Sequence, residues 1–123
     1  MREERTVEDS DYPCPSCGFL VFDEPPGSYV ICPVCGWEDD HVQLRYPSMR
    51  GGANKISLYE SQRNFMKKVS AGEREYLGYM RCFAWRCLNE SDLETDDDAP
   101  KSSLEYFDIA AEASAPYYWE KKR

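Results

Sequence analysis

Four cysteines near the start of the chain have the residue type and spacing of a metal site. Residues 14–18 read CPSCG and residues 32–36 read CPVCG, so a five-residue motif occurs twice. Together the motifs give Cys-x2-Cys-x14-Cys-x2-Cys, in which the candidate ligands are Cys14, Cys17, Cys32 and Cys35. A two-residue spacer lets each pair hold one edge of a tetrahedron around Zn²⁺. The spacing therefore predicts a four-thiolate site with zinc as cofactor, and iron remains an alternative that the same thiolates would accept.

The residues between and after these cysteines favour a preformed turn. Pro15 and Pro33 restrict φ directly after the first cysteine of each pair. Gly18 and Gly36 follow the second cysteine, where the chain bends back most easily with a positive φ. A redox dithiol would need a single Cys-x-x-Cys in a βαβ context, and a structural disulfide is rare in a reducing compartment. Because the protein supplies all four ligands, we expect a closed structural site without a metal-activated water.

The segment between the two motifs predicts a β-hairpin. Residues 18–24 and 28–32 are rich in strand-forming side chains, and the Pro-Pro-Gly of residues 25–27 is typical of a turn. Such a hairpin would bring the two cysteine pairs together at its open end, as in a zinc ribbon. The predicted fold class is α+β: a small zinc-ribbon β-hairpin followed by two or three packed α-helices.

One histidine and three neighbouring carboxylates are the other candidates for chemistry. His41 follows Glu38, Asp39 and Asp40 in a stretch, residues 37–55, that we expect to be a loop. His41 could replace a metal ligand or act as the base of a small hydrolase with one of these carboxylates. Because four cysteines are already present, we predict an exposed loop histidine, with the carboxylates in a solvated turn or capping a helix.

Three helices are predicted after the cysteines. A helix over residues 57–69 begins with the capping-box pair Ser57 and Glu60 and ends by Gly72. Residues 73–88 show helical spacing of apolar residues, with a predicted buried face of Tyr76, Leu77, Met80, Ala84, Cys87 and Leu88. Residues 102–115 begin with a second capping box, Ser102 and Glu105, and the candidates for packing from this helix are Leu104, Phe107, Ile109 and Ala111.

Two further cysteines lie in the second predicted helix. Cys82 and Cys87 are five residues apart, which places them on different faces of a helix, and we expect them to be small core residues. Phe83 and Trp85 lie off the apolar stripe of that helix and would need a covering layer or a partner. The final YYWEKKR is predicted to fray or to dock a partner.

The net charge of −8 is distributed unevenly along the 123 residues. Residues 1–40 carry 10 acidic and 2 basic side chains, and residues 89–112 carry 9 acidic and 1 basic. Residues 41–70 carry 6 basic and 1 acidic side chains, the basic ones being Arg45, Arg50, Lys55, Arg63, Lys67 and Lys68. An acidic chain favours a basic protein partner over nucleic acid, whose binding depends on neutralising phosphates. A nucleic-acid-binding ribbon that uses residues 41–70 stays an alternative.

The sequence also predicts location and domain organisation. It contains no apolar run of about 18 residues and begins with a charged stretch, which predicts a cytoplasmic protein outside the membrane. Five regions are expected: a flexible acidic N-terminus (1–11), the zinc ribbon with its following loop (12–56), a helical segment packed on it (57–88), an acidic linker (89–101), and a C-terminal helix with an aromatic and basic tail (102–123).

The stretch from about residue 12 to residue 67 resembles the bacterial cysteine-rich CPCC domain family. The resemblance lies in both cysteine motifs, in PPGSY and CGWEDD, and in GGAN and the spaced residues of the next helix. Ser16 stands where the family name has a third cysteine, so that thiol is missing while the four clamp cysteines remain. The resemblance implies a small zinc-ribbon-like module. Some family members lie near bacterial toxin systems, so the resemblance implies an immunity or partner-binding role. Together with the closed four-cysteine site, this predicts a non-catalytic protein-interaction module, such as an immunity or adaptor protein.

Overall fold

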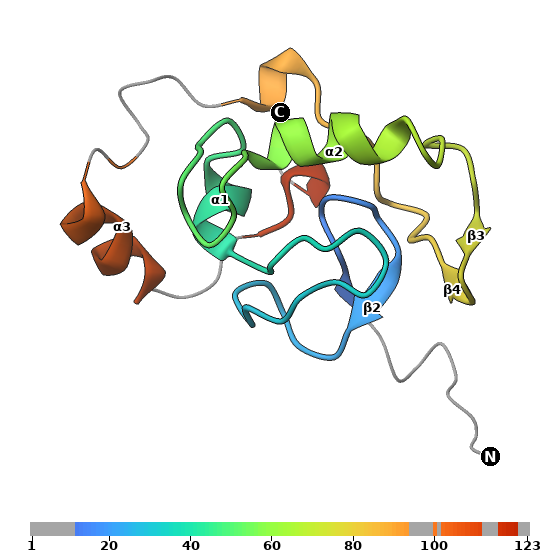
Figure 1. The fold of residues 1–123 in the computed structure, drawn as a ribbon, viewed down its shortest axis with the longest axis horizontal. Coiled ribbons are helices and arrows are strands. Elements are labelled where there is room, and N and C mark those ends of the chain that lie inside the picture. Colours follow the sequence, from blue (N-terminus) through green and yellow to red (C-terminus); the bar gives the residue numbers. More distant parts are fainter. Residues whose placement is uncertain (1–11, 94–99, 101, 112–115, 121–123) are drawn as a thin grey trace.

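The computed structural model describes residues 12–93, 100, 102–111 and 116–120, where short antiparallel strands combine with short helices (Figure 1). The predicted α+β class is therefore confirmed. The elements of these parts are β1 (Tyr12–Pro13), β2 (Leu20–Phe22), α1 (His41–Arg45), α2 (Leu58–Met66), β3 (Glu75–Tyr76), β4 (Tyr79–Met80), the 3-10 helix η2 (Glu90–Asp92), α3 (Ser103–Ala110) and the 3-10 helix η3 (Tyr118–Glu120).

The strand pairing differs from the predicted single hairpin. Residues 18–24 do not pair with residues 28–32; β2 pairs antiparallel with β1 instead. The segment 29–32 forms backbone hydrogen bonds and a bridge with residues 37–39. Each cysteine pair therefore lies at the turn of its own narrow hairpin, and Pro-Pro-Gly connects the two hairpins.

Helix α2 agrees with the prediction at its start and along its buried face. The Ser57 side chain accepts from the backbone N–H of Glu60, and the Glu60 carboxylate accepts from the backbone N–H of Ser57. This reciprocal capping satisfies two amide groups that a helix end leaves unpaired. Leu58 and Phe65 are buried on the predicted face, and so is Val69, although the helix ends before it.

A short helix lies where the sequence analysis expected a loop. The Asp40 carboxylate accepts from the backbone N–H groups of Val42 and Gln43, at 2.8 and 3.3 Å, and so caps α1. Four of the five residues of α1 are buried. Proline and glycine interrupt the sequence only after α1, so the loop prediction was wrong for this first part of the segment.

The predicted second helix, residues 73–88, is wrong. This stretch forms the β3–β4 hairpin, in which Tyr76 pairs with Tyr79 across a two-residue turn. Leu77 and Gly78 both have positive φ, 52° and 85°, as the common two-residue hairpin turn requires. Leu77 is 65 % exposed rather than buried. The helical spacing of apolar residues was coincidental, and the tertiary contacts described below decide the conformation.

The burial of the two C-terminal segments, helix α3 and residues 117–118, is the reverse of the prediction. Helix α3 begins after Ser102 as predicted, and the Ser102 hydroxyl accepts from the Glu105 N–H, which is one half of the predicted capping box. Its core candidates Leu104 and Phe107, however, are 78 % and 65 % exposed. Tyr117 and Tyr118, expected to fray or to dock a partner, are 7 % and 2 % exposed and belong to the core. The predictions for residues 1–11, 94–99, 101, 112–115 and 121–123 lie outside the described residues.

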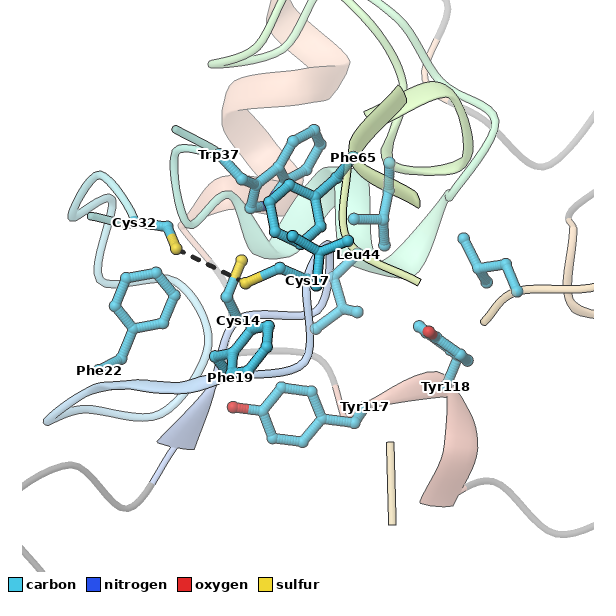
Figure 2. Packing of buried hydrophobic residues seen from close by; sticks show 13 residues of the cluster. Cys14, Cys17, Phe19, Phe22, Cys32, Trp37, Leu44, Phe65, Tyr117 and Tyr118 are labelled. Atoms are coloured by element: carbon cyan, nitrogen blue, oxygen red, sulfur yellow. Dashed lines mark hydrogen bonds between the residues drawn. The ribbon is translucent and has the colours of Figure 1, made fainter. Parts of the chain in front are cut away.

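The core gathers around the cysteine motifs (Figure 2). Aromatic side chains from the N-terminal hairpin, α2 and the C-terminal segment belong to the same buried cluster as the cysteines. The buried hydrophobic cluster consists of Cys14, Cys17, Phe19, Phe22, Cys32, Trp37, Leu44, Leu58, Phe65, Val69, Leu88, Tyr117 and Tyr118. Within the described ranges, no helix is both long and apolar enough for a membrane crossing.

A buried glutamine joins three of these segments. Gln62 of α2 donates through Nε2 to the backbone O of Pro15 at 2.9 Å and to the hydroxyl O of Tyr118 at 2.6 Å. Its Oε1 accepts from the Leu88 N–H at 2.8 Å. Because a buried polar group without a partner is costly, these bonds fix how α2, the first cysteine turn and the C-terminal segment fit together.

Replacing Gln62 by Met should therefore destabilise the protein although the volume is nearly kept. The Leu88 N–H would lose its partner inside the core, and we expect a loss of about 2–3 kcal/mol in the free energy of unfolding. Denaturant unfolding followed by tryptophan fluorescence measures it. Asn64→Met, on the exposed face of the same helix, is the control and should change stability by less than about 0.5 kcal/mol. Equal effects of the two substitutions would contradict this role of Gln62.

Candidate metal centre

The first cysteine turn is closed by two backbone hydrogen bonds. The Gly18 N–H donates to the Cys14 carbonyl at 2.7 Å, and the Cys14 N–H donates to the Phe19 carbonyl at 3.0 Å. Gly18 has φ 85°, a conformation that favours glycine. This is the positive φ predicted from the sequence, and it turns the chain so that both cysteine side chains lie on the inner side of the hairpin.

The second turn repeats the same pattern. The Gly36 N–H donates to the Cys32 carbonyl at 3.0 Å, and the Cys32 N–H donates to the Trp37 carbonyl at 2.8 Å. Gly36 has the same φ, 85°. The backbone N–H groups of Val34 and Cys35 also point at the Cys32 sulfur, at 3.3 and 3.4 Å. Such N–H groups stabilise negative charge on a thiolate.

The four sulfur atoms converge, and Figure 2 shows the thiols of Cys14, Cys17 and Cys32 pointing toward one another. All four lie within 4.8 Å of one another. Cross-hairpin separations are 3.6 Å between Cys14 and Cys35 and 3.7 Å between Cys17 and Cys32. Four sulfurs at 2.3 Å from a central ion would be about 3.8 Å apart. The six cysteines are free thiols, so this cluster has the donors and spacing to hold a metal ion.

The sulfurs lie in an apolar environment. Cys14 and Cys17 are fully buried and Cys32 is 2 % exposed. Burial raises the pKa of Cys14 and of Cys17, because an isolated thiolate there would lose its hydration. Hydrogen bonds from the neighbouring thiols lower the pKa of Cys32. Deprotonating the whole cluster therefore requires a cation at its centre to balance the negative charge.

The two turns are covered to different extents. The first is enclosed by residues 81–88: the Trp85 Nε1–H donates to the Pro15 carbonyl at 2.9 Å, and the Cys82 N–H donates to the Gly18 carbonyl at 2.8 Å. A Cβ on Gly18 would lie 2.4 Å from Trp85 Cδ2, so only glycine fits under the indole ring. A Cβ on Gly36 would meet nothing within 4 Å.

The carboxylates that the sequence analysis considered for catalysis hold the backbone together instead. Asp39 Oδ2 accepts from the Ser28 N–H and hydroxyl, at 3.1 and 2.6 Å. Asp40 Oδ2 accepts from the Ala53 N–H at 2.9 Å and from the Tyr106 hydroxyl at 2.5 Å. Asp39 and Asp40 are only 2 % and 1 % exposed, so the predicted solvated turn is wrong for both, while the predicted capping role of Asp40 is confirmed. Burial raises the pKa of Asp39, and the bonds from Ser28 oppose that shift.

The GGAN segment is fixed by the buried amide of Gln43. Its Nε2 donates to the carbonyls of Met49, Asn54 and Ile56, and its Oε1 accepts from the backbone N–H and side chain of Asn54. Asn54 in turn exchanges two hydrogen bonds with the backbone of Glu38. These contacts support the loop beside the second cysteine turn and give it a structural purpose.

His41 is not the exposed loop residue that was predicted. It is 4 % exposed and begins α1. Its Nε2 lies 3.1 Å from the Ala110 carbonyl, and its ring packs edge-on against Tyr29. Among the described residues, the cluster able to hold a metal consists of the four cysteines and does not include His41. His41 is buried because it contacts α3, about seventy residues away in the sequence. A local sequence pattern cannot indicate such a contact.

Cys82 and Cys87 are not on a helix, and both are partly buried. Burial raises the pKa of Cys87. Neither thiol joins the four-cysteine cluster. They lie on the irregular segment that covers the first cysteine turn. Their spacing of five residues therefore does not place them on two faces of a helix, as the sequence analysis assumed.

The comparison with known families agrees with this geometry. A family model described as Cysteine-rich CPCC matches residues 12–84, more than half of the chain. The chain belongs to the cysteine-rich CPCC family. No curated protein matches it. The match extends beyond the helix at which the sequence resemblance ended, so the CPCC region includes α2, the β3–β4 hairpin and the start of the segment that covers the first turn.

Sequence reasoning missed two residues of this CPCC site. Trp85, expected off the core face of a helix, is 6 % exposed and covers Gly18. Arg81 received no role, yet it is 1 % exposed and donates through Nε to the Cys17 carbonyl at 2.8 Å. The turn signal Leu77-Gly78 could have ended the predicted helix early, but no sequence signal places Arg81 beside a cysteine turn more than sixty residues away.

Gly18 and Gly36 form a matched pair for testing whether Trp85 packs over the first cysteine turn. Gly36→Ala should cost about 1 kcal/mol in the free energy of unfolding, because φ 85° disfavours a Cβ. Gly18→Ala has the same backbone cost plus a clash with Trp85, and it should lose about 2 kcal/mol more. Denaturant unfolding of the metal-loaded variants measures both. Equal losses would show that Trp85 does not pack on Gly18 in solution.

Proposed function

We propose that this CPCC-family chain is a zinc-stabilised module that binds another protein and has no catalytic activity of its own. The observation that carries the zinc assignment is the convergence of four thiols, three buried and one partly buried, at the spacing of a tetrahedron. Four sulfur donors favour Zn²⁺ over hard cations such as Mg²⁺ or Ca²⁺. Bound zinc would neutralise part of the thiolate charge and join the two hairpins. The candidate ligands remain Cys14, Cys17, Cys32 and Cys35.

The donor set supports a structural rather than a catalytic ion. Because four protein thiolates complete a tetrahedron, no coordination position is left for water or substrate. The polar groups nearest in sequence are already engaged, since Asp39 and Asp40 accept several hydrogen bonds and His41 lies against the Ala110 carbonyl. These engagements favour a binding module over the alternative of a small hydrolase.

Helix α3 is the surface we propose for partner binding. Its inner side is attached to the core, where the Tyr106 hydroxyl donates to Asp40. Its outer side exposes Leu104 and Phe107, three residues apart and therefore adjacent on the helix surface. Glu105 and Asp108 are exposed on the same helix. Figure 1 shows α3 at the edge of the molecule, away from the β3–β4 hairpin.

The chemistry of this surface selects a partner with a basic, partly apolar segment. Two exposed apolar side chains offer a desolvated contact, and residues 89–112 carry 9 acidic side chains and 1 basic. Complementary charge speeds encounter and is screened by salt. An immunity or adaptor protein, as the family resemblance implies, would use such a surface. The basic residues of 41–70 support nucleic-acid binding less well, because Arg50 is paired with Glu60 and Arg63 stacks on Tyr59.

Removal of the metal tests the first part of this proposal. Purified protein should contain about one zinc per chain by elemental analysis, and a chelator should abolish its cooperative unfolding transition, because structural zinc contributes directly to folding. Adding Zn²⁺ back under reducing conditions should restore the transition. Metal-free protein that unfolds identically to the loaded form would refute a structural zinc site, and iron in the elemental analysis would replace zinc by the alternative ion.

A pair of variants tests the binding surface. Immobilised zinc-loaded protein is incubated with soluble extract of its host, and retained proteins are eluted with increasing salt. Leu104→Ser combined with Phe107→Ser should lose the salt-sensitive partner while keeping its zinc. The control is Leu77→Ser, which alters an exposed apolar residue on the β3–β4 hairpin and should retain the partner. Equal retention by the α3 variant would exclude α3 as the binding surface.

A further inference from the structure

Arg81 is a buried cation without a carboxylate partner among the described residues. Its side chain is 1 % exposed. Its Nε donates to the Cys17 carbonyl at 2.8 Å, and its Nη1 donates to the carbonyls of Ser70 and Glu73 at 2.5 and 2.9 Å. Its Nη2 is buried and makes no hydrogen bond to the part of the chain that the structure describes. A buried charge is costly unless another charge compensates it.

The surroundings of the guanidinium hold it against the first cysteine turn. Its central carbon lies 4.4 Å from the ring centre of Phe19 and 4.7 Å from that of Trp85. The backbone of Arg81 also bridges to Phe19, directly after the CPSCG turn. Aromatic faces attract a cation but carry no net charge. They position Arg81 beside the cysteines and leave its charge to be balanced by another group.

The cysteine turn that Arg81 contacts belongs to the sulfur cluster, which would carry negative charge around a bound ion. Arg81 donates to the carbonyl of Cys17, one of the four candidate ligands. Four thiolates around one divalent ion carry a net charge of −2, and this charge lies in the same apolar core. The Arg81 guanidinium, which has no carboxylate ion pair among the described residues, therefore contacts the backbone of a turn that would hold this negative charge.

We propose that Arg81 is the counter-charge of the metal centre, a positioning residue that raises metal affinity by stabilising the net negative charge of the four thiolates around the ion. This inference rests on the proposed zinc site. It also explains why β3–β4 and the following segment belong to the metal-binding unit: the hairpin holds Arg81 against Cys17, and the bound ion in turn favours that arrangement. Metal binding and docking of this hairpin are then coupled.

The test compares variants that differ in charge and in shape. Arg81→Met removes the charge and keeps most of the length, and Arg81→Lys keeps the charge. The control is Arg86→Met, which alters an arginine of the same segment whose charge Asp92 already balances. Metal affinity of the full chain is measured with Co²⁺, through its thiolate absorption bands, and by competition between Zn²⁺ and a chelator. We expect Arg81→Met to bind about 10- to 100-fold more weakly, and Arg81→Lys and Arg86→Met to stay within about 5-fold of the original protein.

A second readout separates charge from packing. In protein loaded with iron, reduction changes the charge of the site from −1 to −2, so a nearby cation stabilises the reduced form. The reduction potential of Arg81→Met should therefore be more negative than that of Arg81→Lys. Equal metal affinity in Arg81→Met and the original protein, or equal loss in Arg81→Met and Arg81→Lys, would overturn the proposal. If the original protein binds no metal, the zinc site itself fails, which is a separate outcome.

Discussion

The structure depends on bringing four thiol groups within 4.8 Å of one another inside an apolar core. Each turn is preformed by the same pair of backbone hydrogen bonds, so little further ordering is needed when the sulfurs meet. Burial opposes their ionisation, as the raised pKa of Cys14 and of Cys17 indicates. A cation at the centre would resolve this conflict. In the part of the chain that the structure describes, the longest helix or strand has nine residues, so such a cross-link would supply the stability that larger sheets or helices otherwise provide.

The rest of the chain is organised around the two turns by buried polar side chains. Gln62 and Trp85 hold the first turn against α2 and the C-terminal aromatic residues. Asp40 and Gln43 hold the GGAN loop beside the second turn. These groups act by satisfying backbone N–H and C=O groups where the short elements leave them unpaired. Their polar chemistry is therefore used for architecture.

Local sequence signals were reliable where the chain interacts with its own neighbours. The CPxCG turns, the capping box of Ser57 and Glu60 and the start of α3 depend on residues a few positions apart, and all three occur as predicted. The helix predicted over residues 73–88 failed because apolar spacing is ambiguous in a short segment and because Leu77-Gly78 forms a hairpin turn. The predicted pairing of residues 18–24 with 28–32 failed because each motif closes its own hairpin.

By itself, the sequence determined the family, the α+β class and the identity of the four cysteines that meet, because each is carried by residue types at fixed short spacings. Tertiary structure alone decided that His41 is buried against α3 and that Arg81 lies beside Cys17. It also decided which C-terminal side chains are buried: Tyr117 and Tyr118 belong to the core, whereas Leu104 and Phe107 are exposed. These placements depend on contacts between segments that are far apart in the sequence. The periodicity of apolar residues within one segment does not show which distant segment will pack against it.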